Sequence, residues 1–236
     1  MLEESHKKIA TSVEPEEELI PARGRIPWRA VPFWLAATGG LLVLFIAVGV
    51  YSERLYESID LVGLLKAPIS TFQRNLFGAL AYRSLAVFIP WLGALATLWI
   101  AFARPGWSDR YLWSAAMVFT AMELATDAGQ LFSRHGPSGT EHLYPNPLMV
   151  TGLIAYSSWL LIAAREGQPS PAKRVAEVLF VVALLFIIAF PLLAGYIRSV
   201  DIIGSILFAG ACFSAGVFVA QLCGVDLFKR NDASAG

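Results

Sequence analysis

The sequence predicts an all-α, polytopic membrane protein, a helical bundle of about six transmembrane helices. Its 236 residues are 56% hydrophobic and only 15% charged, whereas soluble domains carry about 25% charged residues. Several segments reach the ~20 apolar residues that a helix needs to cross the hydrocarbon core of a bilayer. They span about 33–51, 85–103, 111–132, 147–164, 175–197 and 202–223. Backbone polar groups must be satisfied inside lipid and no barrel-type alternation is present, so we expect helices.

The polar segments around these helices predict a single domain. Residues 1–27 are an acidic tail, expected to be disordered and cytoplasmic. Residues 28–228 form the six-helix transmembrane domain, and 229–236 are a C-terminal cytoplasmic tail. After the first helix, apolar residues recur at helical spacing over about 68–83, which predicts a helix lying in the membrane interface. This helix either guides lipids toward an outer site or is a simple connector.

The distribution of basic residues predicts the orientation. With the N-terminus inside, the cytoplasmic segments carry twelve Lys and Arg residues and the outer segments six. The positive-inside rule then places both termini in the cytoplasm. We expect the protein in the inner membrane. The 133–146 loop and the turn at 198–201 face outward. A formal net charge of zero argues against nucleic acid as a partner. Three scattered His and two Cys predict no metal site, and we expect no cofactor.

Two carboxylates, Glu123 and Asp127, lie one helical turn apart in the third apolar segment. Acidic side chains inside membrane helices are costly, so they usually face the bundle interior and mark a function or a buried pair. Glu123 is therefore a candidate intramembrane acid and Asp127 a candidate ligand-binding residue. They would line a proton or cation pathway, or position a basic ligand. The alternative is an internal ion pair with Arg134 or Arg198.

The outer loop that follows holds the weak catalytic candidates, Arg134, His135 and His142. Arginine binds phosphate well and histidine exchanges protons near neutral pH. The alternative is a solvated loop of ordinary turn residues. Arg198 and Asp201 form an i, i+3 charge pair where the fifth apolar segment turns into the sixth. We expect either a structural pair or a contribution, together with Arg134, to ligand binding at the outer face.

In layout, the chain resembles the phosphatidic acid phosphatase type 2 superfamily of membrane lipid phosphatases. The shared features are six helices, an interfacial element after the first, and polar motifs at the outer ends of helices three to six. The resemblance covers roughly residues 33–223. That family carries K-x6-R-P after its third helix, P-S-G-H at the start of its fourth, and S-R-x5-H-x3-D between its fifth and sixth.

The first of these motifs corresponds to Asp127-x6-Arg134-His135, in which only the arginine is kept. Asp127 replaces the lysine, and His135 replaces the proline. By its position, the second motif corresponds to Pro145-Asn146-Pro147-Leu148, with Leu148 in place of the acid–base histidine.

The third motif aligns best through Gly195-x5-Asp201-x3-Ser205. There Gly195 replaces the arginine, Asp201 the nucleophilic histidine, and Ser205 its orienting aspartate. The chemistry that the resemblance implies needs two histidines, and needs cations to stabilise phosphate oxygens. Asp127 and Asp201 would instead repel a phosphate dianion.

The sequence therefore predicts a lipid-phosphatase-like scaffold without the catalytic set, a pseudoenzyme that acts as a lipid-binding or accessory membrane subunit. Its partners would be membrane lipids, including lipid phosphates, and a protein partner or second copy packed through the Gly- and Ala-rich last helix. One alternative is a divergent lipid-phosphate phosphatase or phosphotransferase with an outward-facing site that uses Arg134 with His135 or His142. Another is a small ion-coupled transporter, suggested by Glu123 and Asp127.

Overall fold

The computed structural model describes most of the predicted transmembrane domain. The described residues are 30–58, 83–103, 108–132, 134–135, 141–142, 144–165, 170–194, 197–225 and 227–228. The predicted tails at 1–27 and 229–236 lie outside the described residues. So does the predicted interfacial helix, except for residue 83.

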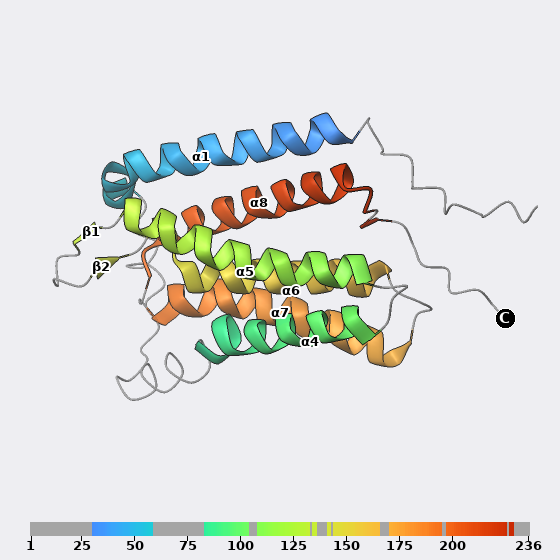
Figure 1. Ribbon diagram of the computed structural model, residues 1–236. Coiled ribbons are helices and arrows are strands. Elements are labelled where there is room, and N and C mark those ends of the chain that lie inside the picture. The colour runs from blue at the N-terminus through green and yellow to red at the C-terminus, as the bar shows by residue number, and fades with distance from the viewer. Residues whose placement is uncertain are drawn as a thin grey trace, which may run out of the picture.

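Helices that run alongside one another make up almost all of the described structure (Figure 1). They are α1 (Val31–Ser58), the π-helical turn η2 (Ser84–Phe88) that continues into α4 (Ile89–Ala103), α5 (Ser108–Leu131), α6 (Pro147–Arg165), α7 (Pro171–Ala194) and α8 (Ser199–Leu222). The two-residue strands β1 (Arg134–His135) and β2 (Glu141–His142) mark one end of the bundle, called the hairpin end below. The opposite end, which holds Ala30, Ser170 and Leu222, is called the termini end.

Five of these helices are long and apolar enough to cross a membrane, which confirms the α-helical membrane bundle. They are Val31–Tyr51, Ser84–Ala103, Pro147–Arg165, Pro171–Pro191 and Ser199–Leu222. Helix α5 has 24 residues, as many as α7 and α8. It is not among the five, and Glu123 and Asp127 interrupt its apolar run. A sixth span, the choice of the inner membrane and the orientation of the termini stay predictions.

Helix α6 is the centre of the bundle. Two-thirds of its apolar window (67%) is buried, against 11% for α1, and it packs against η2, α4, α5, α7 and α8. A small residue allows close approach at Gly152, where a Cβ would lie 2.7 Å from Cδ1 of Ile187. The hydroxyls of Ser114 and Ser158 lie 2.9 Å apart and link α5 to α6. On the other side, α1 packs chiefly along α8.

Polar residues begin two of the helices with side-chain caps. Asn146 Oδ1 accepts a hydrogen bond from the backbone N–H of Met149 (3.1 Å) at the start of α6. Ser170 Oγ accepts one from the N–H of Lys173 (3.2 Å) at the start of α7. In both cases proline is the first helical residue, where its missing N–H costs nothing.

Helix α8 ends in a Schellman motif centred on Gly224. This glycine has a positive φ of 76°, and its N–H donates to the carbonyl of Gln221 (3.1 Å). The next N–H, of Val225, donates to the carbonyl of Ala220 (2.8 Å). The turn directs the chain back to the bundle, where the ring of Phe228 stacks on that of Trp34 with centroids 5.8 Å apart.

The π-helical turn at the start of α4 has a local cause. The N–H of Ile89 donates to the carbonyl of Ser84, five residues back. In the same register the carbonyl of Leu85 would accept from residue 90, but Pro90 has no N–H. The hydroxyl of Tyr156 on α6 donates to the Leu85 carbonyl instead (3.0 Å). A half-buried backbone group is thus satisfied by a neighbouring helix.

Candidate functional site

The hairpin end places two of the predicted catalytic residues next to each other. Strands β1 and β2 are antiparallel, and their register pairs Arg134 with His142 and His135 with Glu141. The backbones of Arg134 and His142 are therefore direct neighbours, although seven residues separate them in the sequence. Sequence reasoning assigned both residues to one loop but did not predict which histidine pairs with the arginine.

The segments aligned with the second and third family motifs also meet. The N–H of Asn146 donates to Ser205 Oγ (2.9 Å), and this hydroxyl donates to the carbonyl of Asp201 (2.6 Å). Asp201 lies in the first turn of α8 and is buried, with 8% of its surface exposed. A carboxylate there interacts favourably with the helix dipole. These contacts link the start of α6 to the first two turns of α8.

An aromatic cluster fills the neighbouring space between α1, α5 and α8. Tyr144 is almost fully buried, and its hydroxyl donates to the carbonyl of Phe45 (2.8 Å). Its ring stacks on the Phe45 ring at 5.1 Å and meets Phe132 edge-on at 5.8 Å. It also covers Gly204, where a Cβ would lie 2.1 Å from a Tyr144 ring carbon. Tyr144 closes this part of the hairpin end.

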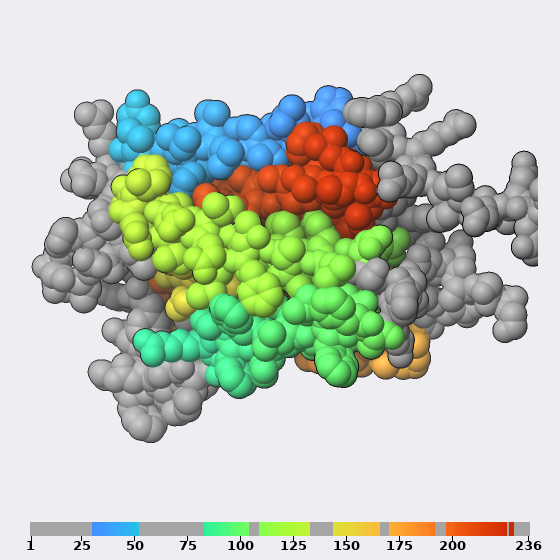
Figure 2. Space-filling view, viewed as in Figure 1, coloured from blue at the N-terminus to red at the C-terminus, as the bar shows by residue number. Residues whose placement is uncertain are grey.

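The two acidic residues of α5 lie on its exposed side. Glu123 and Asp127 are both exposed, as are Thr120 and Gln130 on the same face, whereas Ala125, on the opposite face, is fully buried. Figure 2 shows α5 in the middle of the viewed surface, with α8 and α1 on one side and α4 on the other. The expectation that these acids face the bundle interior is therefore not met. Within the part of the chain that the structure describes, neither acid has an ion-pair partner.

Asp127, Arg198 and Asp201 are not among the residues that line the three cavities considered next. The first, the α4–α6–α7 cavity, has a volume of about 710 Å³ and reaches the termini end at Lys173. The second, the α1–α5–α8 groove, measures about 490 Å³. The third measures about 660 Å³ and is lined by Arg83, Ser84, Val87, Phe88, Trp91 and Leu148.

Sequence reasoning missed Trp159 and Lys173, two polar groups of the α4–α6–α7 cavity. A single tryptophan in an apolar helix has the appearance of a core residue. Lys173 had a weak signal, because a cation in the first turn of a helix opposes the helix dipole. Within the described ranges, no three His, Cys, Asp or Glu side chains come together as a metal site requires.

Comparison of the chain with known protein families, with curated proteins and with solved structures finds no significant match.

Proposed function

We propose that the chain is a non-catalytic membrane protein with a lipid-phosphatase-like layout, acting as an accessory subunit that also binds membrane lipid. The observation that best supports the accessory role is the exposed acidic face of α5. Glu123 and Asp127 lie on that face of a helix in a bundle whose other long helices are apolar enough to span. The replaced motif positions, above all Leu148 and Asp201, support the absence of phosphatase chemistry.

The cost of exposing acids to lipid is the physical reason for a partner. An aspartate at the centre of a membrane helix costs about 2.5–3.5 kcal/mol on insertion scales, and such residues almost always face protein or water. A partner helix with a lysine or arginine would cover Glu123 and Asp127 and neutralise them. A second copy of this chain placed symmetrically on the same face would bring like charges together.

The adjacent α1–α5–α8 groove, of about 490 Å³, can take side chains from one face of such a helix. Its walls include several small residues, which let helix backbones approach closely. They are Ala116 and Ala121 of α5, and Ala211, Ala215 and Gly216 of α8. The groove lies beside the acidic face because Thr120 and Leu124 of α5 also line it.

The test is neutralisation of the acids in the full-length protein. Wild type and the Glu123→Gln/Asp127→Asn variant would be extracted from native membranes in mild detergent and weighed intact by native mass spectrometry. We expect wild type to carry a partner with a basic residue in a membrane segment, and the double variant to lose it. Glu177→Gln, which removes an acid from α7, is the matched control and should keep the partner. A wild-type protein that is always a monomer would refute the accessory role.

A divergent lipid phosphatase is the second candidate, because the strand register pairs Arg134 with His142. It predicts release of phosphate from phosphatidate or an isoprenoid diphosphate, abolished by Arg134→Ala and by His142→Ala. If the folded protein releases no phosphate from any of these lipids, the phosphatase function is excluded and the non-catalytic role is favoured.

A further inference from the structure

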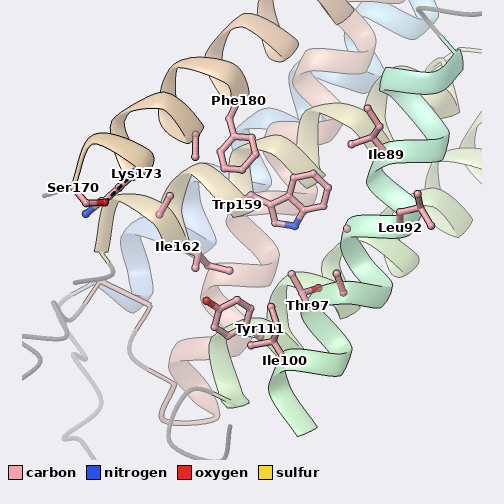
Figure 3. Close-up of a pocket in the computed structure, with 14 residues that line it drawn as sticks. Ile89, Leu92, Thr97, Ile100, Tyr111, Trp159, Ile162, Ser170, Lys173 and Phe180 are labelled. Atoms are coloured by element: carbon pink, nitrogen blue, oxygen red, sulfur yellow. Dashed lines mark hydrogen bonds between the residues drawn. The ribbon is translucent and has the colours of Figure 1, made fainter. Parts of the chain in front are cut away.

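The α4–α6–α7 cavity opens sideways on the surface of the bundle. Helices α4 and α7 both pack on α6, whereas contacts between α4 and α7 are few. The space between them lies over α6 and is lined mostly by apolar side chains of the three helices (Figure 3). Its volume of about 710 Å³ falls in the range of about 300–1,000 Å³ that is typical of ligand pockets.

Trp159 presents an unsatisfied donor in this cavity. Its side chain is buried, with 8% of its surface exposed, and its indole Nε1 has no hydrogen-bond partner. Figure 3 shows the indole among the lining residues, with its nitrogen turned toward Thr97. The Thr97 hydroxyl donates to the carbonyl of Ala94 in its own helix (2.8 Å). A buried donor without an acceptor is costly, so an oxygen acceptor from an occupant would stabilise the protein here.

A water molecule between Trp159 Nε1 and the Thr97 hydroxyl would have two polar partners, the minimum for a buried water. It would leave the rest of this mainly apolar cavity unfilled. The rings of Phe180 and Trp159 lie 5.9 Å apart, and Ile162 of α6 also lines the wall. The surroundings favour an occupant that is apolar over most of its length and carries an acceptor at one point.

The end of the cavity at the termini end is cationic. Lys173 and Ser170 lie there, and Ile89 lies at the far end (Figure 3). Lys173 Nζ forms an ion pair with Glu177 Oε1 at 4.0 Å, which offsets one positive charge. Arg174, the next residue of α7, leaves this first turn with a net positive charge. The first turn of α7 also carries the positive end of its helix dipole. An anionic headgroup is therefore favoured at this end.

The spacing of the two polar features suits one lipid molecule. Phe180, which contacts Trp159, follows Lys173 by seven residues, or about 10 Å along a helix. A glycerophospholipid carries its phosphate at one end of the glycerol unit and its ester carbonyls beside the acyl chains. We propose that the α4–α6–α7 cavity binds one anionic glycerophospholipid, with its phosphate at Lys173 and Ser170 and an ester carbonyl accepting a hydrogen bond from Trp159 Nε1. This inference rests on the lipid-binding part of the proposed function.

The test compares lipids that differ in their ester carbonyls or in the net charge of the headgroup. Delipidated full-length protein in detergent would be titrated with phosphatidylglycerol, with its diether analogue, which lacks ester carbonyls, and with phosphatidylcholine. Native mass spectrometry would count the bound lipids and give their affinities. We expect one saturable phosphatidylglycerol, bound about 2- to 10-fold more tightly than the diether, as one hydrogen bond would produce.

Three variants connect this preference to the residues. Trp159→Phe keeps the aromatic packing and should remove the preference for phosphatidylglycerol over its diether analogue. Lys173→Gln should remove the preference for phosphatidylglycerol over phosphatidylcholine. Trp99→Phe is the matched control, because Trp99 is on α4, is 76% exposed and does not line the cavity. Thermal melting would show that each variant is folded.

The outcomes separate the inference from the proposed function. Saturable binding that Trp159→Phe and Lys173→Gln leave unchanged would place the lipid elsewhere and overturn the inference alone. If wild type shows only non-saturable association with bulk lipid, the lipid-binding function itself is refuted. If Trp159→Phe does not fold, the wild-type affinities for phosphatidylglycerol and for its diether analogue still test the proposal. Equal affinities for the two lipids would overturn it.

Discussion

The hydrogen bond from Tyr156 to the carbonyl of Leu85 predicts a specific loss of stability. Tyr156→Phe removes the hydroxyl that donates to this carbonyl (3.0 Å). Pro90 has no N–H that could replace the lost donor. Hydrogen bonds between membrane helices contribute about 0.6 kcal/mol on average and about 1.7 at most. Because Pro90 cannot donate to the Leu85 carbonyl in the register of the π-helical turn, we expect a value near the upper limit. The measurement is the free energy of unfolding in detergent titrated with a denaturant.

A double-mutant cycle makes this prediction specific. Pro90→Ala returns a backbone N–H to the first turn of α4, so the Leu85 carbonyl gains a donor of its own. In the Pro90→Ala background, Tyr156→Phe should therefore cost clearly less than in wild type. An equal cost in both backgrounds would refute the explanation of the π-helical turn, because the cycle subtracts other effects of each single change.

Three further substitutions test the packing and the caps. Gly204→Ala should lower the free energy of unfolding by about 1–3 kcal/mol, since the new methyl group meets the Tyr144 ring at 2.1 Å; unfolding in detergent measures it. Gly216→Ala should cost less, because the atoms it meets belong to the flexible side chain of Met117. Asn146→Ala should cost about 1 kcal/mol through loss of the α6 cap, and Asn146→Asp, which keeps the acceptor, should restore most of it.

Gly40→Ala is the control for the glycine substitutions. No atom lies within 4 Å of a Cβ built at Gly40, and alanine is the better helix former by about 1 kcal/mol. We expect no loss of stability. A loss as large as that of Gly204→Ala would mean that contact with Tyr144 is not the cause.

The positions of the helices were predictable from sequence because membrane helices are specified by long apolar runs. The segment predicted at 147–164 is Pro147–Arg165, and that at 85–103 is Ser84–Ala103. The largest error is the end of α1, predicted at 51 but reached at Ser58. The starts of α5, α7 and α8, predicted at 111, 175 and 202, lie three or four residues earlier, at Ser108, Pro171 and Ser199. Polar first turns are stabilised by caps and dipoles, which a hydropathy pattern does not detect.

The candidate site was less predictable from sequence. It depends on which side of each helix faces the bundle and on contacts between residues that are far apart in the chain. Helix α5 carries apolar or small residues on all sides, so no periodicity indicated that Glu123 and Asp127 are exposed. The burial of Tyr144 depends on Gly204, 60 residues away in the chain. The unsatisfied nitrogen of Trp159 is a property of the assembled cavity and has no local sequence signal.

The most direct test of the accessory role is photo-crosslinking from α5 in native membranes. A photoreactive amino acid would replace Leu124, which is exposed, lines the α1–α5–α8 groove and neighbours Glu123. The same probe at Val178, 60% exposed on α7, is the control. We expect one discrete protein adduct at Leu124 that disappears in the Glu123→Gln/Asp127→Asn background, and none at Val178. Lipid adducts alone at both positions would show that no partner protein covers the acidic face of α5.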